Sequence, residues 1–145
     1  MKKVLMLFIL FIFGAQMLFA QEEARKAEAA QPYNTGLEFA RKEKYNDAIE
    51  QFKKAIEADS NFPDAHYMLA YCYKKLNNYK EAEAQYKKAI GLDSKFEKAY
   101  IALANLQEDA DRMSDAVSTF KAVLALFNAF SAWLYFLAFK RTSPR

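Results

Sequence analysis

The sequence predicts an all-α protein in which a helix-turn-helix unit is repeated to build a solenoid. The 145-residue chain contains only 3 glycines and 3 prolines, and its long stretches rich in alanine, lysine and glutamate favour helix. Short segments recur along the chain at a constant offset. Within each copy the apolar residues follow the period of an α-helix, so we expect each copy to fold as a pair of helices.

The first 20 residues have the pattern of a secretory signal peptide. Lys2 and Lys3 precede an apolar run at residues 4–13, and Ala20 stands before a polar and charged stretch. A basic start, an apolar core and a small residue at the cleavage point are typical of such peptides. We therefore expect residues 1–20 to be removed and the protein to be exported, either to a bacterial periplasm or to the medium.

Two alternatives concern this segment. Cleavage after Ala15 would also follow a small residue. An uncleaved segment over residues 4–20 would instead anchor the protein in a membrane, although it is at the short limit for crossing a bilayer. The residues that follow, 21–30, are expected to form a polar linker to the repeats.

Comparison of the chain with itself locates the repeat. Residues 51–56, QFKKAI, match residues 85–90, QYKKAI, at an offset of 34. A third copy is more diverged but keeps the same step. The positions shared by all three copies are Ala48, Ala82 and Ala116; Phe52, Tyr86 and Phe120; and Phe62, Phe96 and Phe130. A fixed period of this length indicates a solenoid of stacked units.

Each unit is predicted to contain two helices, because its apolar residues form two stripes at helical spacing. The later stripe is Tyr45, Ala48, Ile49, Phe52, Ala55 and Ile56 in the first unit and Met113, Ala116, Val117, Phe120, Val123 and Leu124 in the third. The earlier stripe is Leu69, Ala70 and Tyr73 in the second unit and Leu103 and Ala104 in the third. Asn77 and Asn78 stand between the two helices of the second unit, and asparagine tolerates the left-handed backbone of a turn. The three units cover residues 31–62, 63–96 and 97–130.

The size pattern and the period of these units resemble the tetratricopeptide repeat, a helix-turn-helix family. The matching positions are Gly36, Phe39, Ala48, Phe52 and Ala55; then Leu69, Ala70, Tyr73, Ala82, Tyr86 and Ala89; then Tyr100, Leu103, Ala104, Ala116 and Phe120. His66 and Tyr100 replace the tryptophan of the family, and Gln107 replaces a large aromatic residue. The resemblance covers residues 31–130 and implies an all-α solenoid that binds other proteins.

The C-terminal segment, residues 131–145, allows three interpretations. If the register continues past a turn at Asn128, residues 131–141 form a capping helix on the third unit. The lack of charge over residues 122–139 would alternatively suit a transmembrane span. In the third interpretation the array is truncated here. A cap would expose aromatic residues as an apolar patch, which marks an interface. The residues through which we predict self-association are Trp133, Phe136 and Phe139.

The sequence contains no recognisable catalytic or metal-binding motif. His66 is the single histidine and Cys72 the single cysteine, so neither a histidine-based zinc site nor a Ser-His-Asp triad is expected. Both residues fall at or beside packing positions of the second unit. The formal net charge of +3 does not indicate the concentrated basic face that nucleic-acid binding needs. We therefore expect no enzymatic activity, no cofactor, no metal ion and no nucleic acid.

The resemblance also implies where a partner would bind. In the tetratricopeptide family the first helix of each unit lines a concave groove that receives peptides or partner helices. The positions that match this groove here are Tyr33, Leu37, Asp64, Tyr67, Tyr71, Lys75, Lys98, Ile101 and Asn105. Tyrosine side chains offer flat contact area at low entropic cost. The alternative is that some of them only cover neighbouring helices.

One specialised function of the family, binding of chaperone tails through two carboxylates, is not supported. The family holds these tails with Lys, Asn and Arg at five groove positions. The corresponding residues here are Tyr33, Leu37, Met68, Lys98 and Ala102, and of these only Lys98 agrees. We predict a protein-protein interaction module, a scaffold or adaptor of the bacterial cell envelope. The alternative is a membrane-anchored assembly factor whose repeats recruit partners.

The mature protein is predicted to begin near Gln21, because the signal-peptide pattern ends at Ala20. Mass spectrometry of the protein from its native host measures this directly. An intact Met1 on a membrane-bound protein would contradict cleavage and favour the anchor.

Overall fold

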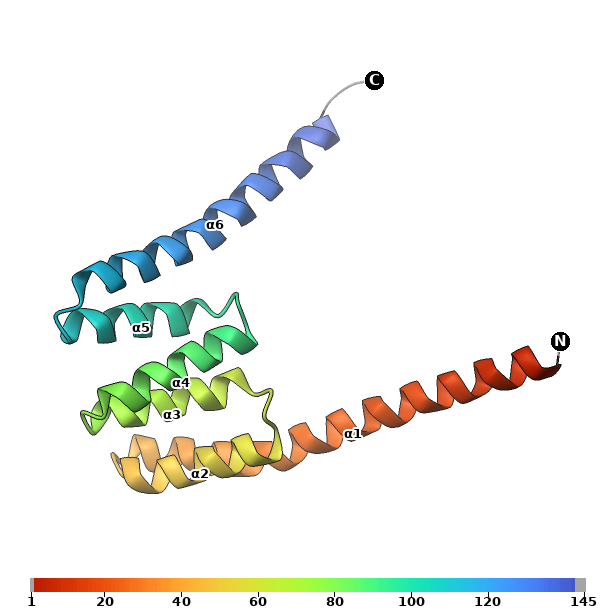
Figure 1. Ribbon diagram of the computed structural model, residues 1–145, viewed down its shortest axis with the longest axis horizontal. Coiled ribbons are helices and arrows are strands. Elements are labelled where there is room, and N and C mark those ends of the chain that lie inside the picture. Colours follow the sequence, from red (N-terminus) through yellow and green to blue (C-terminus); the bar gives the residue numbers. More distant parts are fainter. Residues whose placement is uncertain (1, 143–145) are drawn as a thin grey trace.

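A computed structural model describes the backbone of residues 2–142, which form six helices and no strand (Figure 1). Side chains are described at residue 6, residues 12–126 and residue 128. The helices are α1 (Lys2–Arg41), α2 (Tyr45–Ala58), α3 (Pro63–Lys75), α4 (Tyr79–Leu92), α5 (Glu97–Asp109) and α6 (Met113–Thr142). Packing is most extensive within the pairs α1–α2, α3–α4 and α5–α6, and the pairs stack through α2–α3 and α4–α5. The predicted all-α solenoid of three units is confirmed.

Small residues and aromatic rings alternate in the core of the stack. Ala48 and Ala82 are fully buried, and the rings of Phe52 and Tyr86 are 0% and 1% exposed. Gly36 on α1 lies so close to Phe52 that a Cβ atom there would come within 2.7 Å of the ring carbon Cε1. The helices therefore approach closely where one of them lacks a large side chain, and the ring from the other helix fills the contact.

The turns inside the three units share one backbone geometry. Glu43, Asn77 and Asp111, which occupy the same position in successive repeats, have positive φ angles of 58°, 61° and 57°. In the central turn the amide of Asn78 donates to the carbonyl oxygen of Tyr73 at 2.9 Å. The turn predicted at Asn77 and Asn78 is confirmed. Glu43 adopts the same left-handed conformation at a cost of about 1–2 kcal/mol, whereas Asp111 belongs to the residue types that tolerate it.

Helix α1 extends far beyond its partner α2 on its N-terminal side (Figure 1). Residues 21–30, which we predicted as a polar linker, are helical and continuous with the first helix of the repeats, and Ala29 is already fully buried. Alanine, glutamate and lysine favour helix and supply no stop signal there. Before this point the large apolar side chains that the structure describes are exposed, including Met6 at 65% and Met17 at 61%. No helix of the described part of the chain contains an apolar stretch long enough to cross a membrane.

Helix α6 runs without interruption from Met113 to Thr142. The turn that we predicted at Asn128 is therefore wrong, and the expected capping helix over residues 131–141 is the direct continuation of α6. The physical reason is local: this region lacks glycine and proline, and a single asparagine costs a helix only about 0.7 kcal/mol or less. The predicted self-association residues, Trp133, Phe136 and Phe139, lie outside the described side chains.

The apolar stripe predicted on this helix divides into two faces. Ala116 is 2% exposed and Val123 is half-buried, and both lie toward α5. The remaining members of the stripe are exposed, contrary to the prediction that they would pack; they are Met113, Val117, Phe120 and Leu124. The interior of the solenoid thus includes only one side of α6.

Substitution of Ala82 by tryptophan should destabilise the protein far more than substitution of the neighbouring Glu81. Ala82 is fully buried at a helix contact, where added volume costs about 1–3 kcal/mol or more. Glu81 is exposed on the same helix, where substitutions usually change stability by less than about 0.5 kcal/mol. Thermal unfolding followed by circular dichroism compares Ala82→Trp with Glu81→Trp, and equal melting temperatures would refute the repeat register.

Candidate protein-binding groove

The predicted groove residues occupy equivalent places on the first helices of the three units. Tyr33, Tyr67 and Ile101 stand at the same repeat position on α1, α3 and α5. A second row, one helical turn further along, consists of Leu37, Tyr71 and Asn105. Because the units stack with the same geometry, each row forms a line across the three helices. The structure thus places these six residues in two parallel rows.

Tyr33 and Tyr67 are held by the same arrangement of rings in two successive units. The ring of Tyr33 lies 4.7 Å from that of Phe62, centroid to centroid, and the ring of Tyr67 lies 5.4 Å from that of Phe96. Each tyrosine also lies 5.7 Å from a core ring, Phe52 for Tyr33 and Tyr86 for Tyr67. Burial raises the pKa of both phenols, with a further contribution from the charge of Asp64 for Tyr33 and from Tyr71 for Tyr67. These two tyrosines therefore pack against the core and remain partly exposed.

Phe62 and Phe96 were missing from the predicted groove, although their spacing by one repeat was visible in the sequence. They directly precede α3 and α5. Each packs against a tyrosine on the first helix of the preceding unit, Phe62 against Tyr33 and Phe96 against Tyr67. Their position between units explains how the groove tyrosines are fixed without a hydrogen bond. Packed aromatic pairs of this kind contribute about 0.5–1.5 kcal/mol beyond their buried area.

Tyr71 occupies a more open environment than Tyr67. Its ring meets that of Tyr45 edge-on at 6.4 Å, and the ammonium of Lys75 lies 5.5 Å from the Tyr71 ring centroid. This distance is within the range of a cation–π interaction, which contributes about 0.5–1 kcal/mol at an exposed site. Tyr71 is only half-buried and Lys75 is exposed, so both are accessible to a partner.

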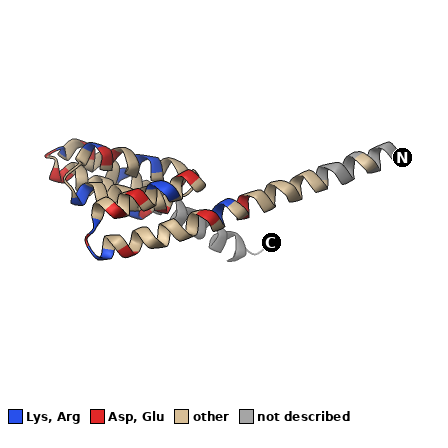
Figure 2. Cartoon of the chain, turned by 90° about the horizontal axis from the view of Figure 1, so that it is seen from below, with Lys and Arg blue, Asp and Glu red and all other residues tan. Residues whose placement is uncertain are grey.

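The groove positions of the third unit are the most exposed. Ile101 is 44% exposed, and Lys98 and Asn105 are also exposed, whereas Leu37 of the first unit is half-buried. Lys98 stands exactly one repeat after the exposed Asp64, so equivalent places carry opposite charges. Figure 2 likewise shows acidic and basic residues interspersed along the repeat helices. The predicted groove positions are therefore aromatic and apolar residues, together with charged residues of both signs.

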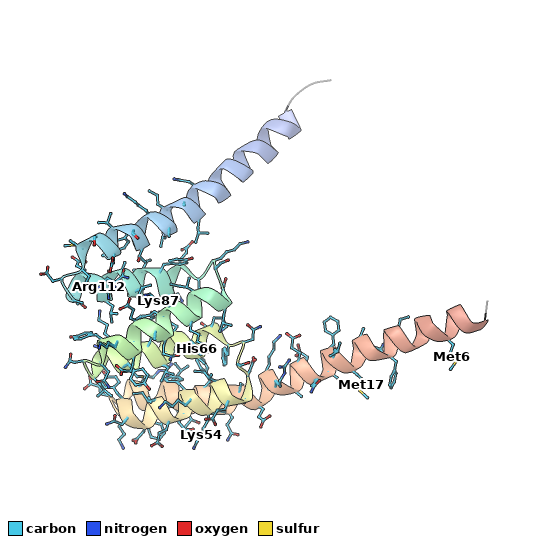
Figure 3. The ribbon with its side chains drawn as sticks, viewed as in Figure 1. Met6, Met17, Lys54, His66, Lys87 and Arg112 are labelled. Carbon is cyan, nitrogen blue, oxygen red and sulfur yellow. The ribbon has the colours of Figure 1, made fainter. Side chains whose placement is uncertain are left out.

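His66 is a residue of α3, and its side chain meets α4 inside the second unit (Figure 3). It is 3% exposed, and its ring atom Nδ1 lies 2.8 Å from the amide oxygen Oε1 of Gln85. The second ring nitrogen, Nε2, is buried and has no hydrogen-bond partner. The predicted packing role of His66 is confirmed. Its burial separates it from any substrate in the groove.

Cys72 is fully buried in the same core cluster as Phe52 and Leu69. Burial raises the pKa of its thiol to about 12, so the reactive thiolate is suppressed at neutral pH. The predicted packing role of Cys72 is confirmed.

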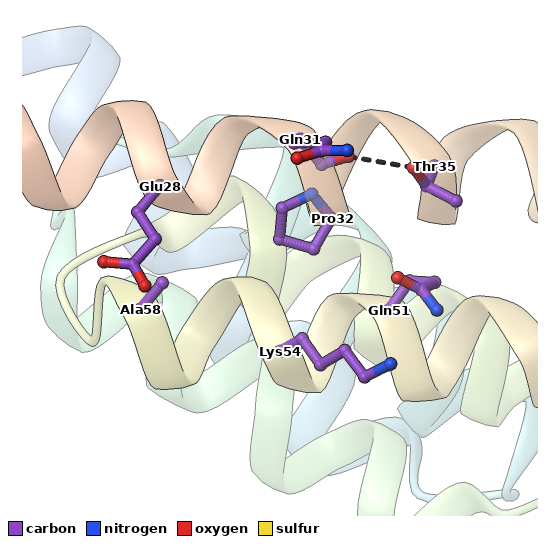
Figure 4. A pocket seen from close by; sticks show the side chains of 7 residues that line it. All are labelled: Glu28, Gln31, Pro32, Thr35, Gln51, Lys54 and Ala58. Carbon is purple, nitrogen blue, oxygen red and sulfur yellow. Dashed lines mark hydrogen bonds between the residues drawn. The ribbon is translucent and has the colours of Figure 1, made fainter.

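A separate hollow of about 310 Å³ lies between α1 and α2 (Figure 4). It is lined by Glu28, Gln31, Pro32, Thr35, Gln51, Lys54 and Ala58. The hydroxyl of Thr35 donates to the carbonyl oxygen of Gln31 at 3.0 Å. One carboxylate and one ammonium in an open, polar hollow do not form a catalytic or ligating set. Among the described residues, no group of three His, Cys, Asp or Glu side chains could hold a metal ion.

Comparisons with known proteins agree with this geometry. A family model described as tetratricopeptide repeat matches residues 39–88. The second such domain of Spaghetti (RPAP3), bound to the HSP90 peptide SRMEEVD, is similar in structure with a TM-score of 0.67 and 30% identity; the match covers 74% of this chain and 97% of that one. The chain belongs to the tetratricopeptide repeat family, whose members are typically protein-interaction scaffolds.

Two further solved structures are similar to this chain. The TPR2B domain of yeast Sti1, in complex with an Hsp70 peptide, has a TM-score of 0.65 and 26% identity over 67% of this chain and 78% of that one. MamA has a TM-score of 0.69 and 24% identity over 72% of this chain and 61% of that one, which shows the shared fold alone. Comparison with curated protein sequences finds no match.

The Cys72 thiol should react with a disulfide reagent at pH 8 at least about 100-fold more slowly in the folded protein than in urea, because the thiolate is the nucleophile and is suppressed by burial. The buried thiol keeps its proton while an unfolded chain loses it above its usual pKa of 9.0. Its contribution to stability is therefore complete below pH 9 and falls as the pH rises toward 12. Ser118→Cys, on an exposed position, is the reactive control; fast labelling of native Cys72 would contradict its burial.

Proposed function

We propose that this protein is a non-catalytic interaction module, a scaffold or adaptor, that binds a segment of another protein across the first helices of its repeats. The observation that carries the proposal is the row formed by Tyr33, Tyr67 and Ile101. Two rings are fixed by packing on the core, and the exposed isoleucine extends the row into the third unit. Prearranged rings lose little conformational entropy on binding, which favours recognition of a partner.

The chemistry of the groove defines the class of ligand. Apolar side chains of a partner would lie on the tyrosine and isoleucine row, while Asp64, Lys75 and Lys98 at its edge would select partner charges of both signs. The relatives that carry peptides in their structures support this use of the fold. We propose a segment with apolar anchors flanked by both acidic and basic residues, rather than an acidic tail.

The carboxylate-tail chemistry of those relatives is not proposed for this chain. Of the five positions that would hold two carboxylates, only Lys98 carries a suitable side chain. Tyr33, Leu37 and Met68 are half-buried apolar or aromatic residues in or beside the first core cluster. Their side chains support packing and offer no positive charge to a carboxylate.

We also propose that the protein acts in the bacterial cell envelope after export. The support is the basic and apolar pattern of residues 1–20. The rival is a membrane-held assembly factor, which the exposed apolar side chains of α1 favour, including Phe13, Leu18 and Phe19. The mass of the mature N-terminus distinguishes these two possibilities.

Truncation of Tyr71 or Ile101 should weaken binding while the fold is retained. A displayed library of random peptides, selected on the native protein, supplies the ligand. We expect Tyr71→Ala and Ile101→Ala each to weaken binding of a selected peptide by about tenfold, as for a central contact residue of an interface. Both side chains are partly or largely exposed, so circular dichroism should show unchanged helicity. Tyr67→Ala should also lower stability, because it removes the packing against Tyr86 and Phe96.

Two controls make this test specific. Glu81→Ala changes an exposed residue on a second helix and should leave binding unchanged. The peptide SRMEEVD should bind no better than its scrambled sequence, because the required basic positions are absent. If Tyr71→Ala and Ile101→Ala bind selected peptides as the native protein does, the groove assignment is wrong.

A further inference from the structure

The face of α6 that points away from the solenoid exposes a continuous apolar stripe. Met113, Val117, Phe120 and Leu124 are 57%, 48%, 42% and 57% exposed. The adjacent side of the helix is occupied by α5: Ala116 is 2% exposed there, and the hydroxyl of Thr119 on α6 lies 2.8 Å from the side-chain oxygen Oε1 of Gln107 on α5. Helix α6 therefore has two apolar faces: one is buried against α5, and the other, the stripe, is exposed.

The equivalent positions in the first two units are covered by the first helix of the next unit. Phe52 is covered by Leu69 and Cys72 of α3, and Tyr86 is packed with residues of α5. Phe120 stands at the same repeat position but remains 42% exposed. The stripe is thus the continuation of the interface between units, with its covering helix missing among the described residues, and a helix is the shape that fits it.

The opposite end of the solenoid cannot supply that helix from another copy. On α1 the positions one repeat before Leu69 and Cys72 are Thr35 and Glu38. Glu38 is exposed, and Thr35 carries a polar hydroxyl where Leu69 has an apolar side chain. Burying this polar face on the apolar stripe would leave a carboxylate without water or a partner, which is costly. Head-to-tail stacking of copies is therefore disfavoured.

The spacing of the stripe matches a second copy of itself. The intervals from Met113 through Val117 and Phe120 to Leu124 are four, three and four residues, which is the spacing of a two-helix seam. This order reads the same in both directions. An antiparallel copy consequently brings Met113 opposite Leu124 and Val117 opposite Phe120, and a two-fold axis creates every such contact twice.

We propose that two copies of this chain associate through this stripe, with their α6 helices antiparallel around a two-fold axis midway between Val117 and Phe120. The charged and exposed Lys121 borders the seam, as expected at the rim of an interface. This association is independent of the groove, because it uses the second helix of the third unit. The dimer would carry two grooves and so bind a partner with two segments more tightly by avidity.

Disulfide cross-linking of the full chain tests the orientation directly. Met113→Cys and Leu124→Cys are prepared as separate proteins carrying tags of different size, and Cys72, being buried, does not compete. Antiparallel pairing predicts a cross-linked heterodimer when the two are mixed and oxidised. Each protein alone should give little product, because equal positions would be about 16 Å apart along the helices, too far for a disulfide. Cross-linking of Met113→Cys with itself, at the efficiency of the mixture, would overturn the proposal in favour of parallel pairing.

A second pair of variants tests the stripe itself. Val117→Lys combined with Leu124→Lys should weaken self-association at least about tenfold, because two charges enter the seam. Ser118→Lys combined with Ala122→Lys adds the same charge at exposed positions off the stripe and should have no such effect. Sedimentation of the full chains measures self-association of the stripe variant and of the control variant. Any association through the apolar part of α1 is the same in the two proteins and therefore does not affect their difference.

Two results of the same experiments would refute the dimer. Equal association of the stripe and control variants would show that the stripe is not the contact. A monomeric chain in which Val117→Cys is protected from a maleimide would show that the stripe is covered within the chain, by residues 131–141 or another segment. Circular dichroism confirms in each case that the variants remain helical.

Discussion

The contact between a ring and a helix that lacks a large side chain is the constraint on which this structure depends. Phe52 lies against Gly36, where even a Cβ atom would come within 2.7 Å of the ring. Tyr86 has the equivalent role in the second unit and is 1% exposed. Because these rings reach from the second helix of a unit to both neighbouring first helices, they set the distance within a unit and between units together. A larger residue in place of Gly36 would therefore disturb the stacking as well as one helix pair.

The groove follows from that contact. Once the units stack with one geometry, side chains at the same repeat position must line up, so Tyr33, Tyr67 and Ile101 form a row without any direct interaction among them. Phe52 and Tyr86 also pack against the tyrosines at the predicted groove positions, with 5.7 Å between ring centroids in both units. In the proposed binding mode, stability and recognition would thus be coupled at Tyr33 and Tyr67, whereas Ile101 would act in recognition alone.

The period and the helical spacing of apolar residues predicted the fold, because both depend on side-chain size, whereas the groove positions came from the resemblance to the tetratricopeptide family and stay a prediction. The turn at Asn77 was predictable from local preference, since asparagine tolerates its backbone. Local preference does not indicate the turn at Glu43, because glutamate disfavours a left-handed backbone; the constant offset of 34 residues from Asn77 is what places it there. Sequence could not predict that α6 continues past Asn128, because a repeat register states which face of a helix is apolar and not where the helix stops.

The continuation of α6 gives the two ends of the solenoid different physical characters. At the first unit, the face directed away from the stack has polar side chains such as Glu38 and needs no cover. At the third unit, α6 leaves the stack with Phe120 half-exposed at a position where Phe52 and Tyr86 are buried. A solenoid is stable in water only when its outermost faces are polar or paired. The polar end is therefore stable against water as it stands, and the apolar end is where the proposed association would lower the free energy most.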